Sequence, residues 1–271
     1  MLHRVLIAAV STIGLAQIAC AADLPVKAPA PVAAPLPTWT GFYVGGNVGG
    51  AWSDDKATLF LLENLTGIAP LTVNTGNAAF IGGVQEGFNW QFDPRWVFGL
   101  EADWSYTNAG RSLSQNLTGL AGAVLPFSSS TLGTRLDWVG SARNRLGFLI
   151  TPTLMLYGTG GVAFGKIDYT GTGALNNPFG FIYAANTAFN KTAVGWTAGA
   201  GLEWMVTSHW LVRGEYLFYD LSSAQNAATN NPLTFNGLCI VGMCPPPTAN
   251  TAFSWGQMRL NEVRAALSYK F

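Results

Sequence analysis

The sequence contains few residues that could carry out nucleophilic catalysis. Its 271 residues include two histidines, His3 and His209, and a serine nucleophile needs a base such as histidine beside it. His209 follows Thr207 and Ser208 in a short stretch between two apolar segments, which is typical of a tight turn. We therefore predict no catalytic residues and a protein that is not an enzyme. A lipid-modifying enzyme that uses His209 is an alternative.

Cys239 and Cys244 are the candidates for a redox or metal site. The third cysteine, Cys20, lies in an amino-terminal segment that we expect to be removed. Metal sites bring several ligands together, whereas the remaining chain contains one histidine, His209, far from both cysteines. Because export to an oxidising compartment permits disulfides, we predict a loop disulfide between Cys239 and Cys244 and no metal.

Haem binding is a further alternative, because haem iron takes His, Met, Cys or Tyr as axial ligands. The long polar connections of the chain contain Tyr169, Tyr183 and Met243, but no histidine. We predict that the protein has no cofactor, and haemin binding is the weaker hypothesis.

Charged residues are the remaining candidates, and alternating segments set their positions. Eight segments alternate apolar with polar or small residues, which is typical of strands whose two faces meet different surroundings. Tight turns separate the second from the third, the fourth from the fifth and the sixth from the seventh, whereas the other connections are long and polar. We therefore predict an all-β fold, an eight-stranded antiparallel up-and-down transmembrane β-barrel. The predicted strands are Gly41–Trp52, Phe80–Phe92, Arg95–Tyr106, Thr134–Leu149, Leu154–Lys166, Thr192–Val206, Trp210–Leu221 and Gly256–Phe271.

The charged residues share one face of these strands. In the last strand, Val263, Leu267 and Tyr269 alternate with Glu262 and Arg264. Because a Lys or Arg at the lipid midplane costs about 2–4 kcal/mol, we place the charges inside the barrel. An eight-stranded barrel has room only for its own side chains, so a packed network is favoured over a charged channel lining. Its predicted members are Glu101, Asp103, Asp137, Arg143, Arg145, Glu203, Arg213, Glu215, Glu262 and Arg264.

Composition and aromatic placement separate this fold from other classes. The chain is 49% hydrophobic and 10% charged, whereas soluble domains average roughly a quarter charged residues. A net charge of zero removes the electrostatic case for nucleic acid. A soluble β-sandwich also has alternating strands, but it gives no reason for Trp96, Trp104, Trp204, Trp210 and Tyr269 to lie near strand ends, as membrane interfaces require.

The amino-terminal residues predict export. Residues 1–21 have a weakly basic start, an apolar core and the small-residue site Ala19-Cys20-Ala21, as in a cleaved signal peptide. Residues 22–38 are rich in Pro and Ala, which favours an extended periplasmic linker. Residues 39–271 then form the predicted outer-membrane barrel.

Several motifs of the chain resemble one family of exported barrels. Thr40-Gly41-Phe42-Tyr43-Val44-Gly45-Gly46-Asn47-Val48-Gly49-Gly50 is similar to the start of the mature outer-membrane immunogenic proteins of alpha-proteobacteria, which have an OmpA-like barrel. The likeness continues in 83–91, 195–203 and 263–271. The resemblance implies an abundant surface protein in the cell outer membrane, and some members are described as porins or haemin binders.

From this resemblance we expect a surface protein that supports envelope integrity, with a small-solute porin as the main alternative. Its expected partners are outer-membrane lipid and lipopolysaccharide, host or surface ligands, and the barrel assembly machinery. In this family a closing aromatic residue is the signal that the machinery reads, which assigns that role to Phe271 together with Tyr269. No peptidoglycan-binding domain is expected, because the sequence stops at Phe271.

Glu86 departs from the pattern of its strand. It occupies the apolar face of the segment Phe80–Phe92, where a small apolar residue would fit better. We therefore expect either a β-bulge at Glu86 or a position outside the hydrocarbon band.

Overall fold

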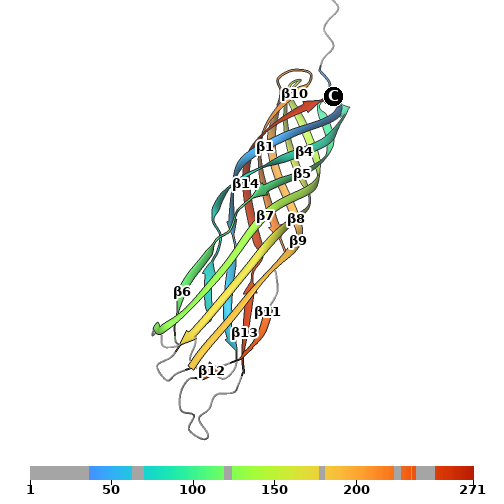
Figure 1. Ribbon diagram of the computed structural model, residues 1–271. Coiled ribbons are helices and arrows are strands. Elements are labelled where there is room, and N and C mark those ends of the chain that lie inside the picture. Colours follow the sequence, from blue (N-terminus) through green and yellow to red (C-terminus); the bar gives the residue numbers. More distant parts are fainter. Residues whose placement is uncertain are drawn as a thin grey trace, which may run out of the picture. The chain divides into compact units, whose positions relative to one another are not determined.

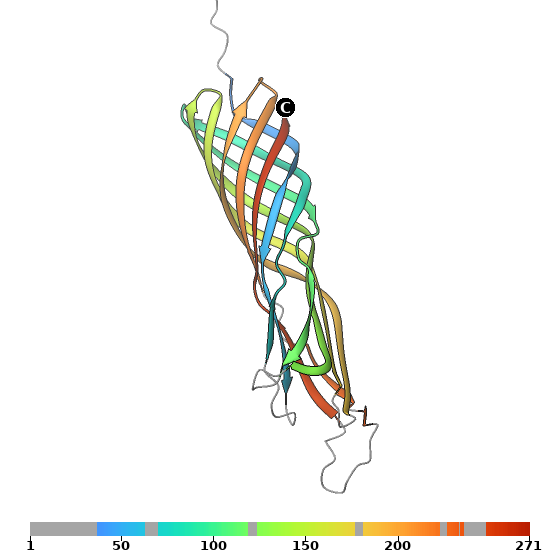
Figure 2. The same ribbon diagram turned by 90° about the vertical axis from the view of Figure 1, so that its left-hand side faces the viewer.

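The computed structural model describes residues 37–62, 70–118, 124–176, 181–222, 227–232, 234–235 and 248–271. Eight antiparallel strands pair in sequence order around a ring, and β10 closes it by pairing with both β9 and β14 (Figures 1 and 2). The fold is all-β and matches the eight strands predicted from the sequence. The ring strands are β1 (Gly41–Asp54), β4 (Ala78–Asp93), β5 (Trp96–Thr107), β7 (Val124–Thr151), β8 (Leu154–Asn176), β9 (Phe181–Met205), β10 (Trp210–Leu221) and β14 (Met258–Lys270).

Among the described residues, no helix has the length and apolar character needed to cross a membrane.

The strands are tilted, and their register measures the tilt. A row of paired residues that starts at Trp210 returns to β10 at Asp220, ten residues further on, after one circuit of the ring. Such a stagger accompanies strands inclined by about 35–45° to the barrel axis. The row passes in order through Tyr269, Val44, Glu86, Ala102, Ala142, Val162 and Trp196.

Alternate side chains point into the ring and out of it. Along β5 every second residue is buried and its neighbours are exposed. The exposed residues include large aromatic side chains at both ends of the ring, as in the girdles of membrane-spanning barrels. The turn-side girdle, at the end of the ring with the short turns, contains Phe42, Trp90, Trp96, Trp204, Trp210, Tyr269 and Phe271. The girdle at the opposite end contains Trp52, Phe80, Trp104, Tyr106 and Trp196.

Glu86 lies on this outward face, contrary to both expectations for it. Its pairing with Val44 and Ala102 is continuous on either side, so no bulge displaces it. Along β4 it is four residues from Trp90 and six from Phe80, which places it between the girdles and therefore inside the apolar band.

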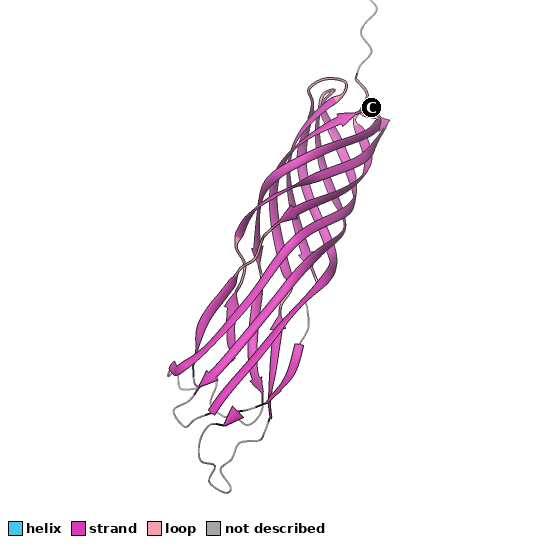
Figure 3. Ribbon diagram, viewed as in Figure 1, coloured by secondary structure: helices cyan, strands magenta, loops and turns pink. Residues whose placement is uncertain are grey.

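Beyond the ring, the long connections form further strands rather than the polar loops that the sequence predicted. β7, β8 and β9 continue past the ring at the end away from the short turns, which is the lower end of the view in Figure 3. Polar residues in these connections alternate with apolar ones, as in Ser112-Leu113-Ser114, so they suit a two-faced strand. The added strands, together with the parts of β7 to β9 beyond the ring, are called the extension. The added strands are β2 (Lys56–Leu62), β3 (Leu71–Asn74), β6 (Ser112–Thr118), β11 (Ala227–Pro232), β12 (Thr234–Phe235) and β13 (Thr248–Trp255).

A polar neck joins the ring to the extension at the level where four described strands are interrupted, between β1 and β2, β3 and β4, β5 and β6, and β13 and β14. Asp55 separates β1 from β2, and its carboxylate accepts hydrogen bonds from Thr75, at 2.5 Å, and from Thr134. Gly110, between β5 and β6, has a φ of 108°, a conformation that favours glycine. Burial raises the pKa of Asp55 above its ordinary value, because the loss of water disfavours the charged carboxylate.

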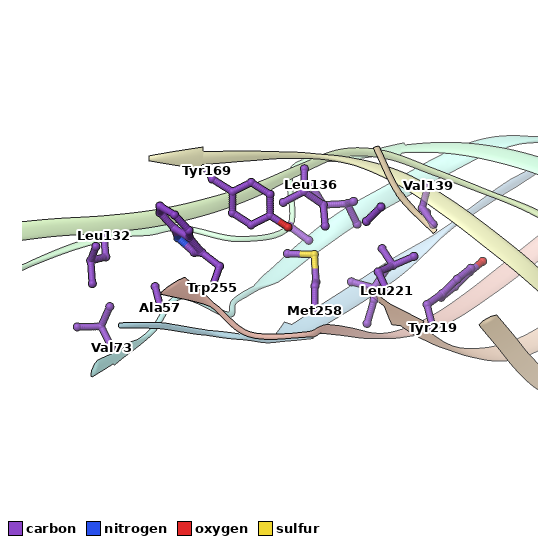
Figure 4. Close-up of a cluster of buried hydrophobic side chains, with 14 of the residues drawn as sticks. Ala57, Val73, Leu132, Leu136, Val139, Tyr169, Tyr219, Leu221, Trp255 and Met258 are labelled. Atoms are coloured by element: carbon purple, nitrogen blue, oxygen red, sulfur yellow. The ribbon is translucent and has the colours of Figure 1, made fainter. Parts of the chain in front are cut away.

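An apolar cluster fills the interior from the extension into the adjoining end of the ring. Its side chains come from strands far apart in sequence and meet across the tube (Figure 4). Burial of this surface stabilises the strands that rise above the membrane band. The cluster includes Ala57, Val73, Leu132, Leu136, Val139, Tyr169, Tyr219, Leu221, Trp255 and Met258.

Candidate functional site: a charged network inside the barrel

The ring encloses a network of ionisable side chains on the turn side of the apolar cluster. Nine of the ten predicted interior charges meet there, at inward positions of β5, β7, β9, β10 and β14. Each is at most 8% exposed. Five are carboxylates and four are guanidinium groups, so nearly every charge has an opposite partner. They are Glu101, Asp103, Arg143, Arg145, Glu203, Arg213, Glu215, Glu262 and Arg264.

Glu101 is the centre of this network. Its Oε1 lies 2.5 Å from Arg143 Nη2, and its Oε2 lies 2.6 Å from Arg213 Nη1. Arg145 Nη1 lies 3.3 Å from Oε2, and the hydroxyl of Tyr43 donates to the same oxygen at 2.5 Å. One carboxylate therefore accepts hydrogen bonds from three guanidinium groups and a phenol.

The other acids complete the pairing of the arginines. Asp103 Oδ2 lies 2.7 Å from Arg143 Nη2 and 2.8 Å from Arg264 Nη2. Glu215 Oε2 lies 2.7 Å from Arg264 Nη2. Because these charges have lost their water, each depends on its partners for compensation.

Glu203 and Glu262 lie at the edges of the network. Glu203 Oε2 accepts a hydrogen bond from Arg145 Nη2 at 2.5 Å. Glu262 Oε1 is 3.6 Å from Arg264 Nη1. The network thus reaches β9 on one side and β14 on the other.

Two tyrosines that the sequence analysis did not select complete the network. The guanidinium carbon of Arg145 lies 4.0 Å from the centre of the Tyr157 ring, a cation–π contact. Tyr43 and Tyr157 fit because Gly87 and Gly201 leave space: a Cβ on either glycine would lie within 2.5 Å of a tyrosine hydroxyl. The inward parity of Tyr43 in β1 was a signal that could have found it.

Trp39 closes the turn-side mouth of the barrel. Its side chain is fully buried, its indole N–H donates to the Pro152 carbonyl at 3.0 Å, and its backbone N–H donates to Gln91 Oε1 at 3.1 Å. It packs in a cluster with Leu149 and Leu211. With the apolar cluster on the other side, the charged network is closed at both ends.

Asp137 does not belong to this network, and its predicted interior position is wrong. The pairing of β7 with β8 shifts register between Leu136 and Trp138, and such a bulge reverses which side chains point inward. Asp137 instead pairs outside the network with Arg135 Nε at 3.0 Å and Lys166 Nζ at 2.7 Å. The hydrogen bond from Lys166 and the nearby charge of Arg135 hold the pKa of Asp137 below its usual value.

The other predicted site residues lie away from the network. Phe271 is exposed, and its ring centre is 5.2 Å from that of Tyr269 at the turn-side rim. Cys239 and Cys244 lie outside the described residues, as do residues 1–36, which contain the predicted signal peptide and most of the predicted linker.

The arrangement suits charge pairing better than bond-breaking chemistry. In the described part of the chain, no cluster of three or more His, Cys, Asp or Glu residues could hold a metal ion. His209 Nδ1 is 2.9 Å from Ser208 Oγ, but both lie in the exposed turn before β10, outside the network. The interior arginines and carboxylates instead form ion pairs with one another.

A closed ring of tilted strands with an apolar outer face, two aromatic girdles and a charged interior defines a transmembrane β-barrel. Comparisons with known proteins specify its family. A family model described as an outer membrane protein beta-barrel domain matches residues 18–271. The chain belongs to this family and is a protein of the outer membrane.

Relatives support the same assignment. The chain is 34% identical over 259 residues to the 31 kDa outer-membrane immunogenic protein of Brucella melitensis, covering 93% of each. It is 29% identical over 207 residues to the 22 kDa outer membrane protein of Rhizobium leguminosarum, covering 75% of this chain and 71% of the relative. The resemblance to outer-membrane immunogenic proteins seen in the sequence is confirmed.

Proposed function

We propose that the protein is a non-enzymatic surface protein whose closed barrel anchors a display structure in the outer membrane. The four long connections face the outside of the cell, where they contact surface or host ligands, and the barrel supports envelope integrity. The observation that carries this proposal is the filled interior. Nine buried charges and an apolar cluster occupy the space through which a porin would pass solute.

The extension supports the display role. Short turns such as the one at 152–153 lie at the end of the ring opposite the extension. Outer-membrane barrels place short turns in the periplasm and long connections outside. A core that includes Leu59, Phe253 and Trp255 gives the display structure a fixed shape.

A porin requires a water-filled path, and the arginine and carboxylate pairs leave the interior without one. The lipid-modifying enzyme needs His209 near the outer leaflet, whereas His209 precedes β10 at the turn side. Both alternatives are therefore weaker than the display role.

Labelling of intact cells tests the display role. Ser114 is exposed in β6 of the extension, and Ser208 is exposed in a short turn. A membrane-impermeant maleimide should label Ser114→Cys on whole cells and Ser208→Cys only after lysis. Cys239→Ser and Cys244→Ser remove background in both variants. Labelling of Ser208→Cys on intact cells, with Ser114→Cys protected, would place the extension in the periplasm and contradict the proposal.

A further inference from the structure

Two polar side chains on the lipid face of the barrel have no hydrogen-bond partner in the described part of the chain. Between the girdles, three carboxyl or amide side chains of the described strands point outward: Glu86, Asn144 and Asn261. Asn261 accepts a hydrogen bond from the Tyr216 hydroxyl at 2.7 Å. Within the described residues, neither the Glu86 carboxyl nor the Asn144 carboxamide has such a contact. Polar groups inside a membrane are costly and usually serve a function.

Glu86 lies deep in the apolar band. It is four residues from Trp90 of the turn-side girdle, which corresponds to a depth of about 10 Å at 3.3 Å per residue and a tilt of about 40°. A lipid headgroup would have to enter the hydrocarbon by that distance to reach the carboxyl. A protein group at the same depth is a better partner.

Asn144 lies at almost the same depth as Glu86. The row from Glu86 through Ala102 to Ala142 crosses two strand spacings toward the extension side, a rise of about 6 Å at this tilt. Asn144 is two residues further along β7 than Ala142, toward the short turns, a return of about 5 Å. The two groups are therefore about 12 Å apart around the wall at one level.

The surface between them is a shallow hollow. It has a volume of about 440 Å³ and is lined by Glu86, Phe88, Leu100, Ala102, Ala142 and Asn144, with Phe42 at its edge. The small side chains of Ala102 and Ala142 allow close approach of a neighbouring wall, as small residues do between membrane helices. Leu100 projects from its rim and is 54% exposed.

We propose that this face binds a second copy of the same chain. A two-fold axis along the membrane normal, midway between Glu86 and Asn144, brings each carboxyl onto the partner's carboxamide. Contacts made twice in this way define an isologous dimer. The same axis places the partner's Leu100 in the hollow between Ala102 and Phe88. A carboxamide both donates and accepts hydrogen bonds, so each pair satisfies two groups that the monomer leaves unpartnered.

Cross-linking in the native membrane tests this contact. Two tagged full-length copies, both with Cys239→Ser and Cys244→Ser, carry Glu86→Cys and Asn144→Cys, respectively. Oxidation should join the two tags in one heterodimer. The matched control places Leu202→Cys and Val212→Cys on the opposite wall, where both side chains are also exposed, and should give no product. Equal yields from the two pairs would overturn the proposal.

Self-association of the purified barrel provides a second measurement. In sedimentation equilibrium in detergent, Glu86→Leu removes both symmetry-related contacts and should weaken dimerisation by about tenfold to hundredfold, because one hydrogen bond within a membrane contributes about threefold to tenfold. Glu86→Gln should retain it, and Val212→Leu should not change it. A wild-type chain that stays monomeric at all concentrations overturns the proposal. So does a bound lipid that is lost in Glu86→Leu, because the occupant would then be lipid.

Discussion

Replacing Glu101 by glutamine is expected to lower the free energy of unfolding by about 3–5 kcal/mol, the usual effect of removing one member of a buried ion pair. Arg143, Arg145 and Arg213 all lie within 3.3 Å of the Glu101 carboxylate. A neutral amide cannot compensate three guanidinium groups, and it also cannot accept as many hydrogen bonds. Urea unfolding in lipid vesicles, followed by tryptophan fluorescence, measures the loss.

Asp137→Asn is the matched control for this substitution. Asp137 also contacts two cations, Arg135 and Lys166, but the side chains of both are well exposed. Exposed ion pairs contribute little because water and salt screen them. The urea midpoint of Asp137→Asn should therefore stay close to that of the wild type. Equal losses in both variants would mean that burial of the network does not determine its energetic role.

Deleting Phe271 is expected to reduce the yield of assembled barrel severalfold while leaving already folded protein nearly as stable. Phe271 is 69% exposed, so its ring contributes little buried surface. Its backbone N–H donates to the Phe42 carbonyl at 2.9 Å, which is one contact among many in this seam. An exposed terminal aromatic suits recognition by the assembly machinery better than packing. Pulse-chase of the heat-modifiable form on gels measures the assembly rate.

Phe42→Ala separates recognition from local packing in this test. The ring centres of Phe42 and Phe271 are 6.1 Å apart, so Phe42→Ala removes that contact and keeps the terminal residue. Assembly of Phe42→Ala should proceed at the wild-type rate. A normal assembly rate after deletion of Phe271 would contradict its role as the assembly signal.

Period-two alternation predicted the ring because a barrel wall separates two different environments at every residue. The same parity placed Glu101 and Arg264 inside, since both strands run without a register shift near them. It failed at Asp137, where a bulge reverses the faces of β7. The residue types of Leu136-Asp137-Trp138 do not indicate that bulge, because it arises from the pairing of β7 with β8.

The extension and the closure of the mouth were harder to predict. Strand formation in 248–255 depends on β2, a partner in a distant connection, whereas 112–118 pairs with the start of β7 in its own connection. Alternation in short polar segments does not reveal such partners. Trp39 lies next to the predicted linker, where composition indicates an extended chain. Its burial depends on packing in one cluster with Val97 and Leu211 from distant strands, and a linear pattern does not contain such contacts.

The filled barrel is expected to display the extension without conducting solute. Planar-bilayer recording from the purified mature chain tests it most directly, with a porin of known conductance reconstituted in parallel as the positive control. Because the charged network and the apolar cluster occupy the interior, the protein should insert without stable unit conductance. Reproducible conductance steps of one size, obtained from protein that migrates as a single heat-modifiable band, would contradict the claim and establish a porin instead.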